Sequence, residues 1–364
     1  MGSDSLTRSQ RVLVTGGAGF VGANLAVALA ERHPTWEVLA LDNLRRRGSE
    51  LNLARLRAAR VEFVHGDVRE PTDLLELDRV DAIVECSADP SVLSGLDGSP
   101  AYPMHTNLLG AYHCLELARR DDAQFIFLST SRVYPVAGLA SIRYDEGATR
   151  FELAESQELP GVSPSGISEA FPLAGARTLY GTTKLAAELI VAEYSASFGV
   201  RTVVNRCGVI AGPWQMGRVD QGVFTYWLLA HHLRKPLRYL GFGGSGKQVR
   251  DLLHVDDLVR LIDEQLEQPG LWAGATVNVG GGRERSLSLR ETSDLCRELT
   301  GNRVEVEAAG GDPRPGDIPI YVSDCSHLAQ LTDWQPQISA LETLADTLSW
   351  IEEHEADVLP VLAA

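Results

Sequence analysis

The sequence of 364 residues predicts an α/β protein, with a Rossmann-type doubly wound parallel sheet and a smaller, discontinuous mixed α/β substrate domain. Three observations support this fold class. Short apolar runs recur through the first half of the chain, helical segments separate most of them, and the first run ends in a cluster of glycines. Apolar runs of this kind are typical of parallel strands buried on both faces, and the glycines mark a strand-turn-helix unit.

The expected elements follow in chain order. The first strand is expected at residues 11–15, and its helix at 23–32, where apolar residues recur at helical spacing. Five further apolar runs are expected to be single strands, at residues 37–43, 61–67, 81–87, 124–131 and 202–210. Beyond Gly212 the pattern fragments, and one more helix (257–268) and one more strand (275–281) are expected before a mixed C-terminal region.

The domain organisation follows from where this alternation stops. Residues 1–211 and 249–281 are predicted to form the Rossmann domain, and residues 212–248 and 282–364 a smaller domain over the carboxyl ends of the strands. Residues 135–178 are rich in Gly, Pro, Ser and Glu and show no clear period. A connection this long inside a compact domain is commonly functional, so we interpret it as a lid or substrate-facing insertion rather than as disorder.

The composition excludes several classes of protein. With 33 Lys and Arg against 49 Asp and Glu, the formal net charge is −16, which disfavours nucleic acid as a partner but leaves room for a local nucleotide pocket. The five cysteines are odd in number and have no metal-finger or thioredoxin spacing, so reduced thiols and no metal are predicted. The polar N-terminus and the lack of a long apolar run predict a soluble cytoplasmic protein with no membrane partner.

A glycine-rich turn follows the first strand. Residues 15–22 read TGGAGFVG, which fits both the GxxGxxG and the GxGxxG pattern. Such glycines allow a tight turn and let the backbone approach a pyrophosphate, which the N-terminus of the following helix attracts. Asp42 lies 20 residues after Gly22, at the end of the next apolar run, where it would hold a ribose 2′-hydroxyl and repel a 2′-phosphate. The pattern therefore favours NAD, although a neighbouring run of three arginines leaves NADP open.

A second acidic side chain ends the third expected strand. Asp67 and Val68 would frame the edge of an adenine. Alternatively, Asp67 caps the helix that follows.

Tyr180 and Lys184 form a candidate catalytic pair. They are four residues apart in YGTTK, a spacing that places both side chains on one face of a helix. An adjacent ammonium and the positive nicotinamide would favour ionisation of the tyrosine, so the pair is a candidate general base. YxxxK alone is a frequent accident, but here the strand at 124–131 ends in hydroxyls, of which Thr130 would hydrogen-bond the substrate hydroxyl that Tyr180 deprotonates.

The glycine turn, the LSTSRVY strand end, YxxxK and the later RDLLHVDDL together resemble the extended short-chain dehydrogenase/reductase superfamily over essentially the whole chain. Within it, DNLRRRG, STSRVY, VDQGVF, GKQVRDLLHVDDL and RPGDIPIYVSD resemble the CDP-tyvelose (CDP-paratose) 2-epimerases. The resemblance implies a tightly held NAD that is reduced and reoxidised in each turnover. It also implies a catalytic triad of Thr130, Tyr180 and Lys184, in which Lys184 binds the nicotinamide ribose hydroxyls.

The predicted cofactor contacts come from the glycine turn, the strand ends beside it and the catalytic helix. They are Gly16, Gly19, Phe20, Val21, Gly22, Asp42, Asn43, Arg46, Asp67, Val68, Ser87, Ala88, Asn107, Tyr180 and Lys184.

The resemblance also assigns substrate contacts, to which Thr130 belongs. Arg250 would grip the nucleotide diphosphate, a task that suits a bidentate guanidinium. Arg314 and Asp317 would lie near the nucleoside and its phosphate, and Gln221 on a loop against the diphosphate. For any one of these arginines alone, a surface salt bridge is the simpler interpretation.

Departures from the superfamily pattern bear on the substrate. Tyr134 is followed by Pro135 instead of Gly, and Val209 replaces an Asn, so the phosphate contact of that Asn must come from elsewhere. Ser131 and Arg132 stand where the sugar 4,6-dehydratases carry an acidic pair that expels water, which disfavours dehydration.

The expected activity is NAD-dependent epimerisation of a nucleotide-diphosphate sugar through a transient keto-sugar. The resemblance favours C2 of a CDP-hexose, whereas the residues themselves leave other sugars and C4 open. A dehydrogenase or reductase with net NAD turnover is the alternative, and the intact triad argues against a non-catalytic NAD-binding regulator. The apolar residues in 184–198 suit a helical interface or a core equally well, and we expect a homodimer or higher oligomer.

Overall fold

The computed structural model describes residues 9–96, 98–217, 221–311 and 316–362. Its strands are β1 Arg11–Thr15, β2 Glu37–Asp42, β3 Glu62–His65, β4 Ala82–Glu85, β5 Gln124–Thr130, β6 Tyr144–Glu146, β7 Phe151–Leu153, β8 Val162–Ser163, β9 Gly166–Ile167, β10 Thr202–Cys207, β11 Val209–Ala211, β12 Leu237–Leu240, β13 Val249–His254, β14 Ala275–Val279, β15 Ser286–Ser288, β16 Val306–Ala309 and β17 Ile320–Tyr321. Its α-helices are α1 Phe20–Arg32, α2 Asn52–Ala58, α3 Pro71–Leu75, α4 Ala101–Pro103, α5 Gly110–Asp121, α6 Val136–Ala140, α7 Leu179–Phe198, α8 Val223–His232, α9 Val255–Glu267, α10 Pro269–Trp272, α11 Leu289–Thr300, α12 Leu328–Leu331, α13 Ala340–Glu353 and α14 Glu355–Leu362. No helix within these ranges is both long and apolar enough to cross a membrane.

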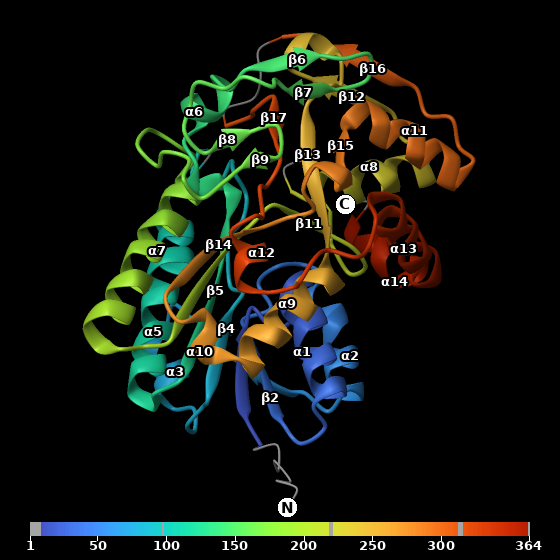
Figure 1. Ribbon diagram of the computed structural model, residues 1–364. Coiled ribbons are helices and arrows are strands. Elements are labelled where there is room, and N and C mark those ends of the chain that lie inside the picture. The colour runs from blue at the N-terminus through green and yellow to red at the C-terminus, as the bar shows by residue number, and fades with distance from the viewer. Residues whose placement is uncertain (1–8, 97, 218–220, 312–315, 363–364) are drawn as a thin grey trace, which may run out of the picture.

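A seven-stranded parallel sheet forms the centre of the molecule. Its strand order is β14-β10-β5-β4-β1-β2-β3, so the chain moves outward in one direction from β1 to β3 and in the other from β4 to β14. Helices α1, α2 and α9 lie on one face of this sheet, and α5 and α7 on the other (Figure 1). The predicted doubly wound, Rossmann-type sheet is therefore confirmed. Ligands of such sheets bind where the order reverses, which here lies between β1 and β4.

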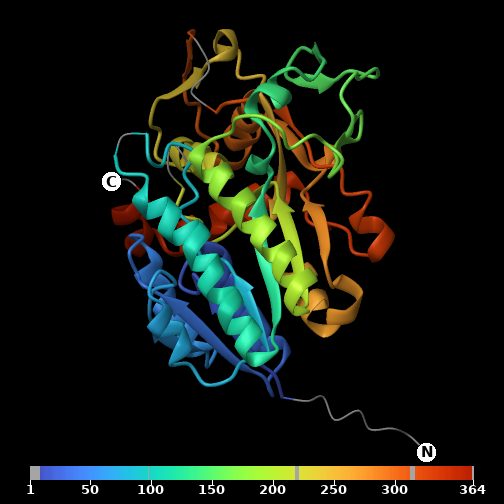
Figure 2. The same cartoon turned by 90° about the vertical axis from the view of Figure 1, so that its left-hand side faces the viewer.

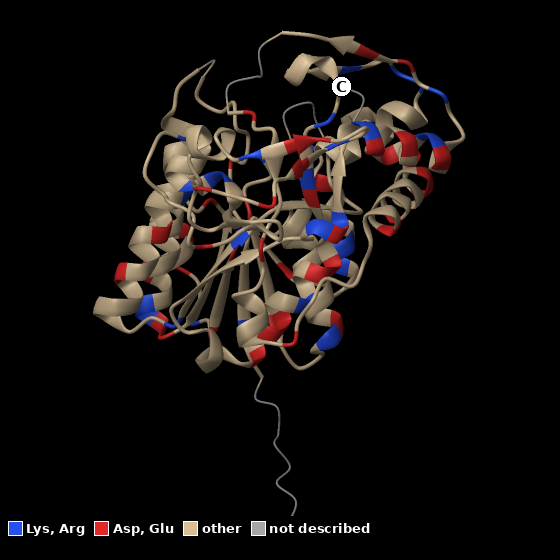
Figure 3. Ribbon diagram, turned by 45° about the horizontal axis from the view of Figure 1, so that its top comes forward, with Lys and Arg blue, Asp and Glu red and all other residues tan. Residues whose placement is uncertain are grey.

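The apolar runs of the sequence are explained by this burial. Every residue of β4, β5 and β10 is buried, because helices cover both faces of the sheet. One apolar core lies under α1 and α9 and a second under α5 and α7. In Figure 3 charged residues are scattered along the outer helices, while the strands of this sheet are mostly uncharged.

The helices α5 and α7 run side by side on one face of the molecule (Figure 2). The side chain of Thr178 accepts a hydrogen bond from the Gly181 N–H at the start of α7. The helix ends at Phe198 and is capped by Gly199, whose φ of 69° suits glycine. Large apolar side chains stay exposed on this face, including Tyr112 of α5 and Leu189 of α7, which is 67% exposed.

The expectation of a single strand at 202–210 was wrong. The run divides at Gly208 into β10, which joins the large sheet, and β11, which pairs with β13 in a second sheet that also contains β15 and β17. The Gly208 N–H still donates to the Val279 carbonyl, but a Cβ at Gly208 would lie 2.9 Å from Oδ1 of Asp251. The chain thus changes sheets at a residue without a side chain, a feature that apolar patterning does not reveal. The domain ranges given above stay a prediction. Strand β13, which those ranges assign to the Rossmann domain, lies in the second sheet.

We call the second sheet, together with α8, β12, α11, β16 and α13, the second lobe. It lies above the carboxyl ends of the large sheet in Figure 1.

Residues 135–178 are folded as helix α6 and the hairpins β6–β7 and β8–β9. The first hairpin is bonded to the second lobe. Arg150 donates to the Ser286 carbonyl (3.0 Å) and to Oε2 of Glu291 (3.2 Å), and the Phe151 N–H donates to the Lys247 carbonyl. The insertion therefore connects the two parts of the molecule.

Candidate active site

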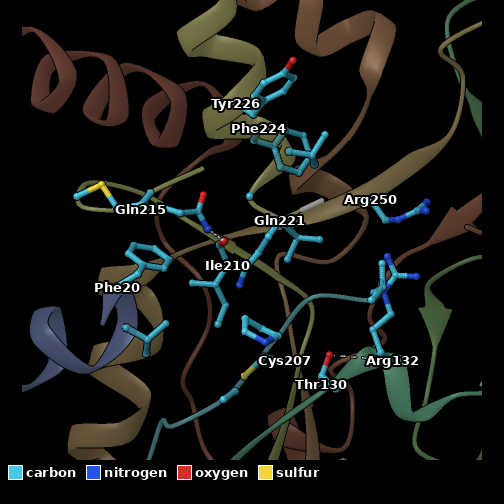
Figure 4. A pocket seen from close by; sticks show the side chains of 18 of the residues that line it. Phe20, Thr130, Arg132, Cys207, Ile210, Gln215, Gln221, Phe224, Tyr226 and Arg250 are labelled. Atoms are coloured by element: carbon cyan, nitrogen blue, oxygen red, sulfur yellow. Dashed lines mark hydrogen bonds between the residues drawn. The ribbon is translucent and has the colours of Figure 1, made fainter. Parts of the chain in front are cut away.

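A cavity of about 1040 Å³ lies between the carboxyl ends of the large sheet and the second lobe. The glycine turn lines one part of it, the end of β5 and the start of α7 another, and the second lobe the rest. Figure 4 shows Phe20 on one side of the cavity and Arg132 and Arg250 on the other, with Thr130 and Cys207 between them. A cavity of this size at a topological switch point is where a dinucleotide and a substrate would be expected.

The glycine turn is shaped for close backbone approach. Gly16 has φ of 62°, and a Cβ at Gly22 would lie 2.2 Å from the Gly16 carbonyl oxygen, so the turn admits no side chain there. The first hydrogen bond of α1 runs from the Ala23 N–H to the Gly19 carbonyl, so the N–H groups of Phe20, Val21 and Gly22 carry the positive end of the helix dipole. Gly16, Gly19, Phe20, Val21 and Gly22 all line the cavity, and this cradle fits the pyrophosphate of a dinucleotide.

Asp42 lies at the end of β2, against the turn. Its carboxylate accepts hydrogen bonds from the Ala18 N–H (3.1 Å) and the Leu44 N–H (2.7 Å), and burial raises its pKa. The three arginines that follow are engaged elsewhere. Arg45 stacks on the Tyr102 ring, Arg46 donates to the Gln221 amide oxygen and to the Met216 carbonyl, and Arg47 donates to the Pro360 carbonyl. All three therefore have partners within the protein, and Arg46 and Arg47 also line the cavity.

The Asp67 carboxylate, which follows β3, accepts hydrogen bonds from the side chains of Asn43 and Arg69. Burial alone would raise its pKa, but hydrogen bonds from Arg69 and Asn43 outweigh burial and hold the pKa of Asp67 at about 2. The alternative that Asp67 caps the next helix was wrong, because Glu70 is the residue before α3. Val68 is buried, and neither residue lines the cavity.

The end of β5 brings Thr130 beside Tyr180. Thr130 accepts a hydrogen bond from the Arg132 N–H (3.2 Å) and is hydrogen-bonded to the Tyr180 phenol, and both side chains line the cavity. Burial raises the pKa of Tyr180 to about 12, although Thr130 and Arg132 both favour its phenolate. The chain alone therefore keeps this phenol protonated at neutral pH.

Lys184 lies one helical turn beyond Tyr180 and is paired with a residue that the motif analysis missed. Its Nζ is 3.3 Å from Oε2 of Glu85 and 4.0 Å from the centre of the Phe127 ring, and it does not line the cavity. The signal for Glu85 was its carboxylate inside an apolar strand, DAIVECS.

The predicted substrate residues meet on the far side of the cavity. Arg250 donates to Oδ1 of Asp317 (2.9 Å) and to the carbonyls of Val249 and Ile318, and burial lowers its pKa to about 10. Arg132, which sequence analysis used only to argue against dehydration, reaches the same place and donates to the Gly316 carbonyl (2.9 Å). Arg314 lies outside the described residues.

Two guanidinium groups and one carboxylate thus face this end of the cavity, which suits an anion such as a diphosphate. Gln221 also lines the cavity and accepts a hydrogen bond from Arg46.

Three other predicted cofactor residues lie after β4 and in the π-helical segment Met104–Leu109 between α4 and α5. Ala88 lines the cavity, whereas Ser87 and Asn107 do not. The Asn107 amide is bonded within the protein, to Asp89 and to Thr183. None of the residues 135–178, all of which the structure describes, lines the cavity, so the expected substrate-facing insertion is not seen.

Comparison with known proteins places this site in context. Residues 12–280 match the model of the NAD dependent epimerase/dehydratase family. The chain is 29% identical to the CDP-paratose 2-epimerase of Salmonella typhi, over 93% of this chain and 98% of the relative. It is 30% identical to the dTDP-glucose 4,6-dehydratase of Mycolicibacterium smegmatis, over 95% of this chain and 94% of the relative.

A solved structure extends the likeness to three dimensions. The UDP-glucose 4-epimerase of Thermus thermophilus, in complex with NAD, superposes with a TM-score of 0.73 at 26% identity and covers 94% of this chain and 99% of its own. The family match spans most of the chain and includes the glycine turn, Thr130 and the Tyr180–Lys184 helix. The chain belongs to the NAD dependent epimerase/dehydratase family.

Proposed function

We propose that this protein epimerises a nucleotide-diphosphate sugar, with NAD as its resident cofactor. The observation that carries the proposal is the content of one cavity: the glycine turn on one side, hydrogen-bonded Thr130 and Tyr180 in the middle, and Arg250 with Asp317 on the other. The glycine turn suits a dinucleotide, the two hydroxyls suit the reacting sugar carbon, and the arginine suits a diphosphate.

We propose that the cradle from Gly16 to Gly22 and Asp42 hold the cofactor, and that Lys184, which lies behind the cavity wall against Glu85, reaches the nicotinamide ribose from there. When bound, NAD supplies a reversible two-electron acceptor for the sugar carbon. Asp42 already accepts two backbone hydrogen bonds and has lone pairs left for a ribose hydroxyl. Of the other predicted cofactor residues, Arg46 and Ala88 line the cavity, whereas Asn43, Asp67, Val68, Ser87 and Asn107 do not.

Tyr180 acts as the general base and Thr130 as its partner. Thr130 positions the substrate hydroxyl, and Tyr180 takes the proton from it and later returns the proton to the same oxygen. With a pKa of about 12, Tyr180 is almost entirely protonated at neutral pH, so its service as a base depends on a positive charge brought into the site that lowers this pKa.

The nucleotide end is anchored away from the reacting carbon. Arg250 and Asp317 are proposed to hold the diphosphate and the nucleoside, together with Gln221 and Arg314. Because these contacts do not touch the sugar ring, a keto-sugar can turn over and present its other face while remaining bound.

The substrate that we propose is a CDP-hexose, inverted at C2. The likeness to the Salmonella typhi CDP-paratose 2-epimerase supports this choice, and Arg132 is a poor replacement for an acid that would expel water. C4 inversion is the second candidate, favoured by the likeness to the Thermus thermophilus enzyme.

The test is a screen of CDP-, UDP-, GDP-, ADP- and dTDP-sugars in heavy water, with the products followed by NMR and the cofactor by absorbance. An epimer without net reduction of NAD is the expected result, and its inverted ring carbon identifies C2 or C4. Steady accumulation of reduced cofactor and release of a keto-sugar would instead make the protein a dehydrogenase.

We further propose that two copies associate through α5 and α7. These helices leave Tyr112 39% and Leu189 67% exposed on one face. Leu189→Glu should convert a dimer to a monomer in sedimentation velocity, and an unchanged sedimentation coefficient would contradict this interface.

A further inference from the structure

The Glu85–Lys184 pair is a buried ion pair in the centre of the molecule. The side chains are 1% and 2% exposed, and Nζ lies 3.3 Å from Oε2. Removing one partner of such a pair leaves an uncompensated charge, which is far more costly than the loss of a surface salt bridge. Neither residue can therefore be exchanged as freely as an exposed one.

The position of Glu85 is fixed by the sheet. It is the last residue of β4, in register with Thr15 of β1 and Phe127 of β5, so its backbone is held by strands on both sides. Lys184 reaches it from α7, and its Nζ also lies over the Phe127 ring. The ammonium is thus held from two sides, by a carboxylate and by an aromatic face.

The pair lies next to the proposed base. Lys184 follows Tyr180 by one helical turn. The titratable groups around Glu85 are Lys184 and Tyr180 from α7, Cys86 beside it in the chain and Cys114 from α5. Burial raises the pKa of Glu85, and the charge and hydrogen bond of Lys184 oppose that rise. Around Tyr180 they are Cys207, Arg132 and Glu85 itself. Lys184 is therefore the cation that faces Glu85 in this group.

We propose that Glu85 is a positioning residue, which anchors the Lys184 side chain below Tyr180 and keeps it in the charged ammonium form. A lysine buried without a partner gives up its proton readily, because a low-dielectric surrounding disfavours the charge. The effect of Glu85 on catalysis rests on the proposed function. The charge of Lys184, in contrast, can be measured without any enzymatic turnover.

The chain offers a clear way to observe this charge. It contains three lysines, Lys184, Lys235 and Lys247. Full-length protein labelled with carbon-13 at lysine Cε gives one NMR signal for each, and Lys235→Arg and Lys247→Arg assign the two others. The chemical shift of each Cε follows the protonation of its own amine.

The test is a pH titration of these signals in Glu85→Gln, which keeps the side-chain shape and removes its charge. We expect Lys184 to lose its proton about one pH unit or more below the pH at which it does so in the unsubstituted protein. Glu85→Asp keeps a carboxylate, so Lys184 should titrate close to its original position. Should the glutamine variant fail to fold, Glu85→Asp still tests the anchor, because shortening the side chain should move the Cε signal of Lys184.

A matched control exists at the surface. Lys247 pairs with Glu146 at 2.8 Å, but the Glu146 side chain is 61% exposed. Glu146→Gln should leave the titration of Lys247 nearly unchanged, since water screens the pair. An equal, small effect of Glu85→Gln and Glu146→Gln on their lysines would overturn the proposal.

Enzyme kinetics provide a second, separate test of the role of Glu85. If the substrate screen yields an epimerase, Glu85→Gln should lower kcat more at high pH than at neutral pH and leave KM nearly unchanged. If the screen yields none, the proposed function fails while the lysine titration still decides the role of Glu85.

Discussion

Gly22→Ala tests whether the glycine turn binds the cofactor as argued. A Cβ at this position would lie 2.2 Å from the Gly16 carbonyl oxygen, 2.8 Å from the Gly16 carbonyl carbon and 2.9 Å from the Gly17 Cα. All three atoms belong to the backbone, so no side chain can rotate away and the turn itself must open. Overpacking of this kind costs about 1–3 kcal/mol.

That strain falls where a pyrophosphate would be held. If the whole overpacking cost weakens the binding of NAD, the Kd for NAD rises roughly 5- to 150-fold. The assays are the NAD content of the purified protein and a titration of the cofactor-free protein with NAD, with urea unfolding to measure stability.

Gly270→Ala is the matched control, since Gly270 lies in helix α10 and a Cβ there meets nothing within 4 Å. Its NAD affinity should be unchanged and its stability equal or slightly higher. Gly22→Ala with the NAD affinity and stability of the unsubstituted protein would refute the reasoning from steric contact.

Three further outcomes are expected. Tyr180→Phe should lower kcat by about 10²–10⁴ and leave the NAD content unchanged, and a rate near that of the unsubstituted enzyme would exclude Tyr180 as the base. Glu188→Gln leaves Arg206 buried without its 2.7 Å partner, so the free energy of unfolding should fall by about 3–5 kcal/mol in denaturant titration, and a loss below 1 kcal/mol would contradict this. Because hydrogen bonds from Arg69 outweigh burial and hold the pKa of Asp67 at about 2, below its unfolded value, this carboxylate stabilises the fold above about pH 4 and ceases to do so as pH falls through 2. Asp67→Asn should therefore cost about 2 kcal/mol at pH 7, and the difference should shrink toward pH 2 in urea unfolding at several pH values.

The features that the sequence predicted well are local. The glycine turn, its helix and the Tyr180–Lys184 spacing are each contained in a few consecutive residues. Their positions in a parallel sheet follow from apolar runs that need burial on both faces. Thr130 could be added because β5 ends at the same edge of the sheet as β1.

The features that it missed depend on residues far apart in the chain. Glu85 and Lys184 are 99 positions apart, and Arg46 meets Gln221 across 175 positions, so no local pattern reports either pair. The break between β10 and β11 is of the same kind. The run from 202 to 210 carries no turn signal except Gly208, and the close approach of Asp251 and Ser323 explains why a glycine stands where the chain changes sheets.

The hairpin β6–β7 ties the two parts of the molecule together through Arg150 and Phe151, yet contributes no residue to the cavity wall. The residues that hold the architecture are therefore distinct from those that would meet a ligand. A library of variants at the cavity wall can explore new sugar specificities while this brace remains intact. Because the residues that stabilise the fold are separate from those of the cavity wall, substitutions that change the substrate need not destabilise the protein.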